Sequence, residues 1–394
     1  MGHRLVEPLN KTRTTYDYWY PRELDAGETR VPVIPDSVKR FTDQGAEVHI
    51  EAGMGQSVRI EDSAYEKAGA TIVTDRTALL NNADIVLRLR KPSIEEVGQL
   101  KKGSIHISFL DPFNENELVD AFAAAGVTSI SMEMIPRTTR AQKMDALSSQ
   151  ASLAGYAMVV LAAERLDKIL PMMMTPAGTI SPSRVFIIGA GVAGLQAIAT
   201  AKRMGARVDA FDTRPVVKEQ VESLGGKFVE IDLGETGQTA GGYANALTPE
   251  QVQLQLDGQK KVCAQSDIVI TTAQLFGRPA PTVVTKEMLE AMKPGSVVVD
   301  LAVESGGNVE GSVAGEEVEI NGVKVIGLAN MPGRVANNAS QMYSANLHNL
   351  VLEYWNKETK QFDLDMEDEI IKGCVITHDG EMVNEMIKNI RGDK

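Results

Sequence analysis

The sequence predicts an α/β protein with two doubly wound parallel-sheet domains and a cleft between them. Three observations carry this prediction. The chain has 394 residues, which is longer than a single hydrophobic core usually grows. Short β-rich runs alternate with helical stretches in two successive series, the rhythm of parallel sheets covered by helices. Within the second series, residues 189–194 form a glycine-rich turn between a strand pattern and a helix pattern.

The first series contains short runs of apolar and β-branched residues. They occupy residues 47–51, 71–74, 84–88, 104–109 and 128–134. From Ala141 onward the pattern changes, because apolar residues recur at steps of three and four as far as Leu161. This spacing predicts one long helix that leaves the first domain.

The second series supplies further runs at residues 184–188, 207–211, 227–231, 267–271, 296–301 and 323–328. A helical stretch follows at residues 338–356, and then a hairpin-like region at 362–383 with Asp379 and Gly380 at a turn. We expect this C-terminal part to rejoin the first domain. The predicted domains are therefore residues 1–142 with 331–394, and residues 143–330.

Composition limits the partners open to the chain. Lys and Arg number 40 against 53 Asp and Glu, and the net charge of −13 opposes contact with nucleic-acid phosphates. We therefore expect no nucleic-acid partner. The two cysteines, Cys263 and Cys374, lie far apart beside apolar neighbours, which favours reduced thiols and a cytoplasmic location.

Neither a membrane span nor a signal peptide is expected. The most apolar helical stretch, residues 154–163, runs at once into the charged residues Glu164 and Arg165. Residues 1–16 are polar and lack the apolar core of a signal peptide, so we interpret them as a flexible extension.

The glycine-rich turn begins where the apolar run 185–188 ends. Gly189 permits a tight turn, Gly191 lets the backbone approach a pyrophosphate, and Gly194 lets the following helix pack close to the strand. The first helical residues, Val192 and Ala193, would offer unpaired N–H groups to that anion. This spacing in this context is typical of Rossmann-like dinucleotide-binding domains.

The next predicted strand ends at Asp212, where a carboxylate can accept hydrogen bonds from ribose hydroxyls. The same charge would repel a 2′-phosphate, so the sequence favours NAD(H) over NADP(H). NADP(H) remains an alternative, because the guanidinium of Arg214 could bind that phosphate.

Polar residues also follow the predicted strand at 267–271. Thr271, Thr272 and Ala273 would lie at its carboxyl end, where ligands bind in open α/β sheets. An ordinary core position for Thr271 is equally compatible with the sequence. The residues expected to contact the dinucleotide are Gly189, Gly191, Val192, Ala193, Gly194, Asp212, Thr213, Gly242, Thr271, Thr272 and Ala273.

Residues 233–249 are too rich in glycine for a helix and too long for an ordinary connection. The stretch is either a mobile lid or a disordered segment. Tyr243 is its only aromatic residue, and it is the side chain we expect to reach a bound nucleotide if the segment closes.

A polar segment joins the strand at 128–134 to the long helix, and it contains Arg137, Gln142 and Asp145. These side chains could hold carboxamide and ribose groups by directed hydrogen bonds. Strand-to-helix junctions also carry polar residues merely as caps, so both interpretations stay open.

The five histidines show no spacing suited to a metal, and neither cysteine has a partner. The sequence therefore predicts no metal site. No nucleophile motif is present either, so a covalent mechanism has no support.

Together these segments resemble the NAD(H)-binding component, domain I, of proton-translocating nicotinamide nucleotide transhydrogenases, which share a superfamily with alanine dehydrogenase. The resemblance covers roughly residues 19–379. Its most specific stretches are residues 26–31, 134–145, 148–156, 189–195, 218–226, 241–243 and 279–281.

The resemblance implies that Arg137, Gln142, Asp145 and Ser148 orient a nicotinamide, and that the segment around Tyr243 is a mobile loop. It implies direct hydride transfer from NADH to NADP⁺ without a metal or a flavin. The NADP(H)-binding and membrane-spanning subunits would be other chains. The protein would then be a homodimer, held peripherally at the cytoplasmic side of the inner membrane.

Two alternatives remain. An alanine dehydrogenase is favoured by Arg30, which matches that branch's substrate-binding arginine, but Phe109 stands where that branch has a catalytic histidine. Arg90 and Glu304 also replace its lysine and aspartate. His106 is offset by three residues and points to the opposite face, so we interpret it as structural. The other alternative is a non-catalytic NAD-responsive binding module.

Overall fold

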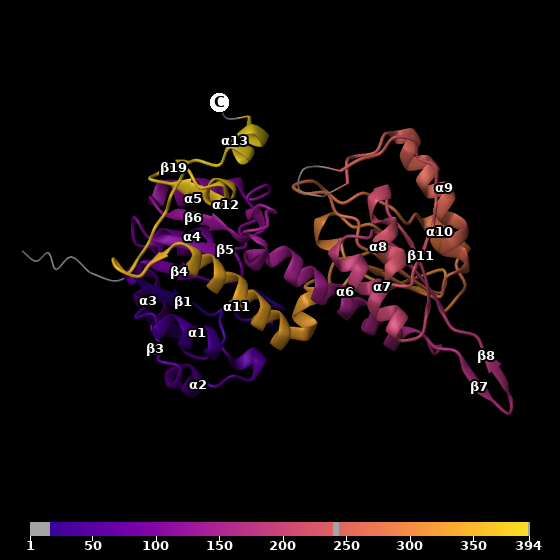
Figure 1. Ribbon diagram of the computed structural model, residues 1–394, viewed down its shortest axis with the longest axis horizontal. Helices are drawn as coiled ribbons and strands as arrows, with labels where there is room; N and C mark the ends of the chain where they lie inside the picture. The colour runs from indigo at the N-terminus through magenta and orange to yellow at the C-terminus, as the bar shows by residue number, and fades with distance from the viewer. Residues whose placement is uncertain (1–15, 239–243, 393–394) are drawn as a thin grey trace, which may run out of the picture. The chain divides into compact units, whose positions relative to one another are not determined.

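A computed structural model of the protein describes residues 16–238 and 244–392. The chain forms two compact units, each with its own sheet (Figure 1). The first unit comprises Met1–Asp25, Val31–Met144 and Tyr343–Lys394, and the second comprises Ala26–Arg30 and Asp145–Met342. The sequence predicted that the chain passes between the domains near residues 142 and 331, and in the structure it does so after Met144 and after Met342. The sequence did not predict that Ala26–Arg30 belongs to the second unit.

The first unit contains an eight-stranded sheet. In spatial order its strands are β19 (Glu381–Met382), β18 (Val375–His378), β6 (Thr128–Ser131), β5 (Ile105–Ser108), β4 (Ile85–Leu87), β1 (Asp17–Tyr20), β2 (Glu47–Glu51) and β3 (Thr71–Val73). Strands β1 to β6 are parallel in the doubly wound order, which reverses between β1 and β4. Strands β18 and β19 come from the C-terminal part of the chain and are antiparallel additions to this sheet.

Helices and one short hairpin complete the first unit. They are α1 (Pro35–Thr42), α2 (Asp62–Lys67), α3 (Arg76–Asn82), α4 (Ile94–Gln99), α5 (Asn116–Ala125), the C-terminal part of α11 (Ala336–Glu353), α12 (Glu369–Cys374), α13 (Glu385–Arg391), and the hairpin β16 (Trp355–Asn356) with β17 (Gln361–Phe362). Strand β1 at the centre was missed from the sequence. Its Tyr18, Trp19 and Tyr20 are buried, but so short an aromatic run after a polar lead shows no alternation.

His106 on β5 is fully buried beside Phe122 of α5, and neither ring nitrogen has a hydrogen-bond partner among the described residues. Burial, aided by the charge of Arg88, holds the pKa of His106 well below its ordinary value of 6.5. As the pH falls below that value, the unfolded chain takes up a proton that the folded chain does not. The neutral His106 ring therefore contributes no penalty to the free energy of unfolding above about pH 6.5, and the folded state loses stability as the pH falls below that value.

Replacement His106→Leu should remove this contribution to the pH dependence. Between about pH 7 and about pH 5, the free energy of unfolding of the wild type should fall more steeply than that of the variant, by up to about 1.4 kcal/mol per pH unit. Urea denaturation at a series of pH values measures both slopes. Parallel slopes would show that His106 is not the group that titrates.

The second unit contains a seven-stranded sheet. In spatial order its strands are β11 (Lys227–Phe228), β10 (Arg207–Phe211), β9 (Arg184–Ile188), β12 (Ile268–Thr271), β13 (Val297–Asp300), β15 (Val323–Ile326) and β14 (Glu317–Ile320), of which only β14 is antiparallel to its neighbour. The helices are α6 (Ala146–Arg165), α7 (Val192–Arg203), α8 (Lys218–Ser223), α9 (Pro249–Gln265), α10 (Lys286–Ala291) and the start of α11. The doubly wound α/β fold is therefore confirmed in both units.

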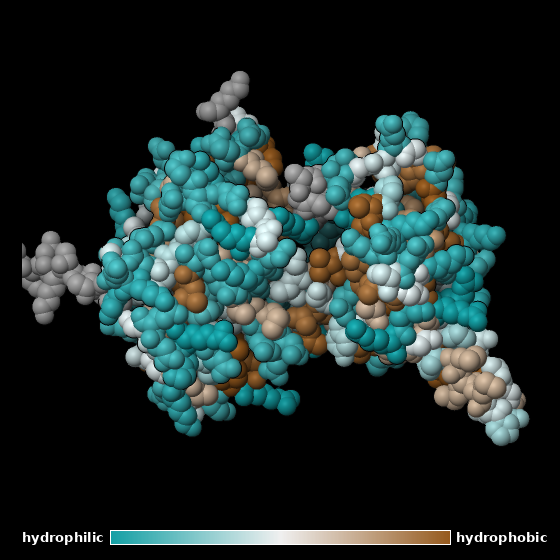
Figure 2. All heavy atoms as spheres, in the orientation of Figure 1, coloured by the Kyte–Doolittle hydropathy of each residue, from teal (hydrophilic) through white to brown (hydrophobic). Residues whose placement is uncertain are grey.

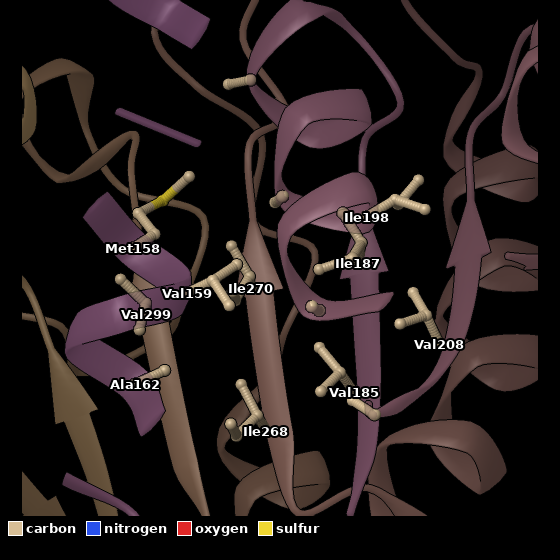
Figure 3. Close-up of a cluster of buried hydrophobic side chains, with 14 of the residues drawn as sticks. Met158, Val159, Ala162, Val185, Ile187, Ile198, Val208, Ile268, Ile270 and Val299 are labelled. Carbon is tan, nitrogen blue, oxygen red and sulfur yellow. The ribbon is translucent and has the colours of Figure 1, made fainter. Parts of the chain in front are cut away.

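Helix α6 packs against this sheet and against α7. Figure 3 shows Met158, Val159 and Ala162 of α6 beside Ile270 and Val299 of the two central strands. The helix begins at Ala146 and not at Ala141 as predicted. The reason is the cap, because the carboxylate of Asp145 accepts the backbone N–H of Ser148 at 2.9 Å.

By length and composition α6 could cross a membrane, since its most apolar window has a mean hydropathy of 1.4. Half of that window is buried inside the unit, as expected for a core helix. The expectation that residues 154–163 do not span a bilayer therefore rests on packing, because composition alone would permit a span.

The second unit also carries an exposed hairpin, and each unit contains one buried cysteine. The hairpin β7 (Met173–Thr175) and β8 (Gly178–Ile180) is exposed throughout. Met173 and Met174 are among its exposed residues, as is Met172 directly before it, and Figure 2 shows tan and pale surface over the hairpin. Cys263 and Cys374 are both buried free thiols, as expected. Burial raises the pKa of each to about 12, so neither is a thiolate at neutral pH.

Candidate functional site

The turn at Gly189 lies where the strand order of the second sheet reverses. Strand β9 ends at Ile188, which pairs with Thr271 at the end of β12. Gly189 has φ of 98°, a conformation that favours glycine, and a Cβ there would lie 2.6 Å from Oγ1 of Thr272. The reversal point of a doubly wound sheet is the place where such folds bind ligands.

The other two glycines of the turn have different surroundings. A Cβ on Gly194 would lie 1.9 Å from the carbonyl oxygen of Gly189, so the strand–helix packing itself requires glycine there. A Cβ on Gly191 would meet no atom of the described residues within 4 Å. Those residues therefore leave open space at Gly191, and as the N-cap residue of α7 it has no side chain of its own to cap the helix. Together these features fit the close approach of an anion to Val192 and Ala193.

Asp212 follows β10 directly and lies beside this turn. Its carboxylate is nearly buried and accepts the backbone N–H of Ala190 at 2.8 Å. Arg214 donates to both carboxylate oxygens at 2.8 Å, and this hydrogen-bonded pairing raises the pKa of Arg214. The guanidinium is thus engaged by Asp212, which argues against the alternative in which it binds a 2′-phosphate.

Three predicted contact residues, Thr271, Thr272 and Ala273, lie at the carboxyl end of β12. Thr271 is wholly buried, with its hydroxyl directed at the carbonyl of Val299, so its side chain packs in the core. Contact between its backbone and a dinucleotide stays a prediction. Thr272 is half-buried and donates to the carbonyl of Gly189 at 3.0 Å. Ala273 stays at the edge, where its backbone forms two hydrogen bonds with the amide of Asn308.

Asn308 and Asp300 were not found from the sequence. Asp300 ends β13, is fully buried, and accepts the backbone N–H groups of Ala302, Asn308 and Val309. It thereby fixes the loop from which Asn308 reaches Ala273. An aspartate that ends an apolar strand, followed by Gly306-Gly307-Asn308, was the available signal.

The glycine-rich stretch after β11 is anchored beside Thr213. The hydroxyl of Thr236 donates to the carbonyl of Thr213 at 2.6 Å, and the side chain of Gln251 on α9 bonds the carbonyls of Leu233 and Glu235. The residues of the stretch that are held in this way, Leu233, Glu235 and Thr236, all lie before residue 239. The predicted contacts Gly242 and Tyr243 lie outside the described residues.

The polar segment before α6 is divided between the units. Arg137 and Gln142 are exposed and belong to the first unit, whereas Asp145 and Ser148 belong to the second. Asp145 accepts both the N–H and, at 2.6 Å, the hydroxyl of Ser148. The capping role of Asp145 is therefore present. Because the Ser148 hydroxyl donates to Asp145, its oxygen remains available only as an acceptor.

Gly155 is a further residue that sequence reasoning did not single out. A Cβ at this position of α6 would lie 2.2 Å from the carbonyl oxygen of Ala193. The absence of a side chain therefore lets α6 approach the first turn of α7, the turn that presents its N–H groups at Gly191. Such contact between two helix backbones needs a residue as small as glycine.

The first sheet reverses its strand order between β1 and β4, but charged side chains occupy that edge. Arg88 pairs with Glu96 at 3.0 Å and lies 3.7 Å from Glu23, and Arg76 pairs with Glu51 and Glu96. Burial raises the pKa of Glu96, but its two arginines bring it down to about 2. The charges of these groups neutralise one another, and their side chains fill the edge of the sheet. The turn at Gly191 in the second sheet has no such side chains against it among the described residues.

Phe109, Arg30 and Glu304, which bear on the alanine dehydrogenase alternative, each contact another residue of this chain. Phe109 lies against the ring of Tyr343, with centroids 5.3 Å apart. Arg30 is buried and donates to Glu28 and to Gln150 at 2.7 to 2.9 Å. Glu304 accepts the backbone N–H of Asn330. An aromatic contact thus stands where a histidine relay would be required.

One trio in the described part of the chain brings possible metal ligands within 4.8 Å of one another: Asp17, Glu47 and His49. Asp17 and Glu47 open β1 and β2, and the His49 ring stacks on Trp19 at 3.9 Å. The trio lies at the amino ends of its strands, whereas ligands of open sheets bind at the carboxyl ends. We assign no metal to it.

Comparison with known proteins now adds a family. The description Alanine dehydrogenase/PNT, N-terminal domain, matches residues 19–154, and Alanine dehydrogenase/PNT, C-terminal domain, matches residues 158–385. The chain belongs to the alanine dehydrogenase/PNT family. The join between the two matches falls within α6, close to the crossing between the two units.

Relatives in the alanine dehydrogenase/PNT family include both named branches. The chain is 44% identical over 371 residues to the first part of NAD(P) transhydrogenase subunit alpha of Rhodospirillum rubrum, covering 92% of this chain and 97% of that protein. Alanine dehydrogenase of Halomonas elongata is 28% identical over 328 residues, covering 82% of each chain. The crystal structure of transhydrogenase from Sinorhizobium meliloti matches with a TM-score of 0.81 and 44% identity, covering 94% of this chain and 99% of that one.

Proposed function

We propose that this chain is the NAD(H)-binding component of a proton-translocating transhydrogenase, and that it passes hydride from NADH directly to NADP⁺ held by another chain. The observation that carries the proposal is the turn at Gly191. There an uncapped helix N-terminus and open space lie beside the Asp212 carboxylate. A pyrophosphate fits the N–H groups, and the adjoining ribose fits the carboxylate.

The residues of this chain would bind and orient the nucleotide. NADH supplies the hydride with both its electrons to NADP⁺, so the balance requires no further electron carrier. Arg137 and Gln142 would hold the nicotinamide carboxamide, while the oxygen of Ser148, fixed by Asp145, would accept one N–H bond. Catalysis of this kind consists mainly of positioning.

The transhydrogenase reaction is favoured over oxidation of alanine by two observations. Phe109 follows β5 and packs its ring against Tyr343, and a phenyl ring has no group that can take up or release a proton. The transhydrogenase relative is also covered almost completely at 44% identity, against 28% for the alanine dehydrogenase. Arg30, which matches the substrate-binding arginine of the alanine dehydrogenase branch, donates to Glu28 and Gln150.

Partners and location follow from the same proposal. The Rhodospirillum rubrum relative is named as one portion of a subunit, so the NADP(H) site and the proton channel would belong to other chains. We further propose a homodimer that associates peripherally with the cytoplasmic face of the inner membrane through these chains. A non-catalytic NAD-responsive module is the competing proposal.

The deciding experiment mixes the purified chain with NADH and an NADP⁺ analogue whose reduced form absorbs at a different wavelength, with and without an added NADP(H)-binding transhydrogenase domain. Hydride transfer that requires the added domain is the expected result. A parallel reaction supplies pyruvate and ammonium as the oxidant. NADH oxidation by that pair alone would replace the proposal with an alanine dehydrogenase, and binding of NADH without either reaction would favour the silent module.

Gln142→Asn should slow hydride transfer while leaving NADH affinity nearly unchanged, because the shorter amide no longer reaches the position from which it orients the ring. We expect the single-turnover rate to fall by about ten-fold or more, with the dissociation constant of NADH within about two-fold. Stopped-flow absorbance and NADH fluorescence measure the two quantities. An unchanged rate when chemistry is limiting would contradict the role of Gln142.

A further inference from the structure

Gln142 is exposed, yet the backbone on either side of it is held firmly. Ala141 and Met144 are fully buried, and the Met144 N–H donates to the carbonyl of Ala141 at 2.8 Å. Arg140 pairs with Asp368, and Lys143 pairs with Glu353 at 2.6 Å. An exposed side chain on so constrained a backbone has a defined origin and direction.

Two side-chain amides on α11 (orange in Figure 1) also hold this backbone. The side-chain N–H groups of Asn346 and Asn349 both donate to the carbonyl oxygen of Lys143, at 3.1 and 3.0 Å. The two asparagines are spaced three residues apart and so share one face of the helix. Two donors on one carbonyl fix its direction, and with it the plane of the peptide between Lys143 and Met144, directly after the residue that follows Gln142.

We propose that Asn346 and Asn349 are positioning residues for Gln142 in hydride transfer. This inference rests on the proposed function. A reacting group must be held within about 0.5 Å of its productive place, and a displacement of about 1 Å can lower a rate by about a hundred-fold. The asparagine pair contributes such constraint without touching the nucleotide.

The test compares Asn346→Asp, Asn349→Asp and the double variant with Asn338→Asp, an exposed asparagine on the same helix. Aspartate keeps the shape of asparagine but cannot donate to the carbonyl. With NADH, the NADP⁺ analogue and an added NADP(H)-binding domain, the double variant should lose about ten-fold or more of the single-turnover rate. NADH affinity should stay within about two-fold of the wild type.

Hydrogen exchange of the peptide 137–144, measured on the chain alone, should be faster in the double variant and unchanged in Asn338→Asp. Asn349→Gln, which retains an amide donor, should keep more activity than Asn349→Asp. If exchange and rate both match the wild type, or if exchange rises without any loss of rate, the inference is overturned. If the wild type itself transfers no hydride, the proposed function fails, while exchange still tests whether the pair holds the peptide.

Discussion

Gly155→Ala should destabilise the second unit by about 2–4 kcal/mol and weaken NADH binding by about ten-fold or more. The added Cβ would lie 2.2 Å from the Ala193 carbonyl oxygen, a backbone atom that can retreat only if α7 moves as a whole. Movement of α7 displaces the N–H groups at Gly191, which is why stability and affinity should fall together. Urea denaturation and NADH fluorescence measure them.

Gly98→Ala is the matched control, because it makes the same chemical change in α4, where a Cβ meets nothing within 4 Å. Alanine is the better helix former, so this variant should be as stable as the wild type or more stable by up to about 1 kcal/mol. Equal effects of the two substitutions would show that the approach of α6 to α7 is unimportant for binding.

Asp212→Ala should raise the dissociation constant of NADH by about a hundred-fold. The carboxylate would accept a ribose hydroxyl, and a hydrogen bond to a charged group contributes about 1.5–3 kcal/mol. Arg214, released from its two hydrogen bonds with Asp212, would then be available to a 2′-phosphate. NADPH binding should accordingly weaken less than NADH binding, so that the ratio of the two dissociation constants moves closer to one.

Asp209→Ala is the control on the same strand, because Asp209 pairs with Arg184 at 3.2 Å but lies before the carboxyl end of β10. Titrations of both variants with NADH and NADPH by fluorescence give the four constants. A loss of NADH affinity in Asp209→Ala equal to that in Asp212→Ala would indicate a general effect on the sheet, and the ribose role of Asp212 would fail.

Much of the fold was predictable because its signals are local. The predicted strands at residues 184–188 and 207–211 match β9 and β10 without change, since apolar runs of this length directly precede and follow a helical pattern. The start of α6 was misplaced, because apolar spacing continues through Ala141 while a single hydrogen bond from Asp145 decides where the helix begins. Strand β1 was missed for lack of alternation.

The sequence by itself determined the two doubly wound sheets, the separate demands on Gly189, Gly191 and Gly194, and the acid at the end of β10. Each of these depends on residues close together along the chain, whose spacing reports backbone conformation directly. Only the tertiary structure decided that Thr271 is core and that Asn308 holds Ala273. It also placed Asn346 and Asn349 on the carbonyl beside Gln142. These contacts join residues far apart in the chain, and no local periodicity encodes which distant side chain will meet a given carbonyl.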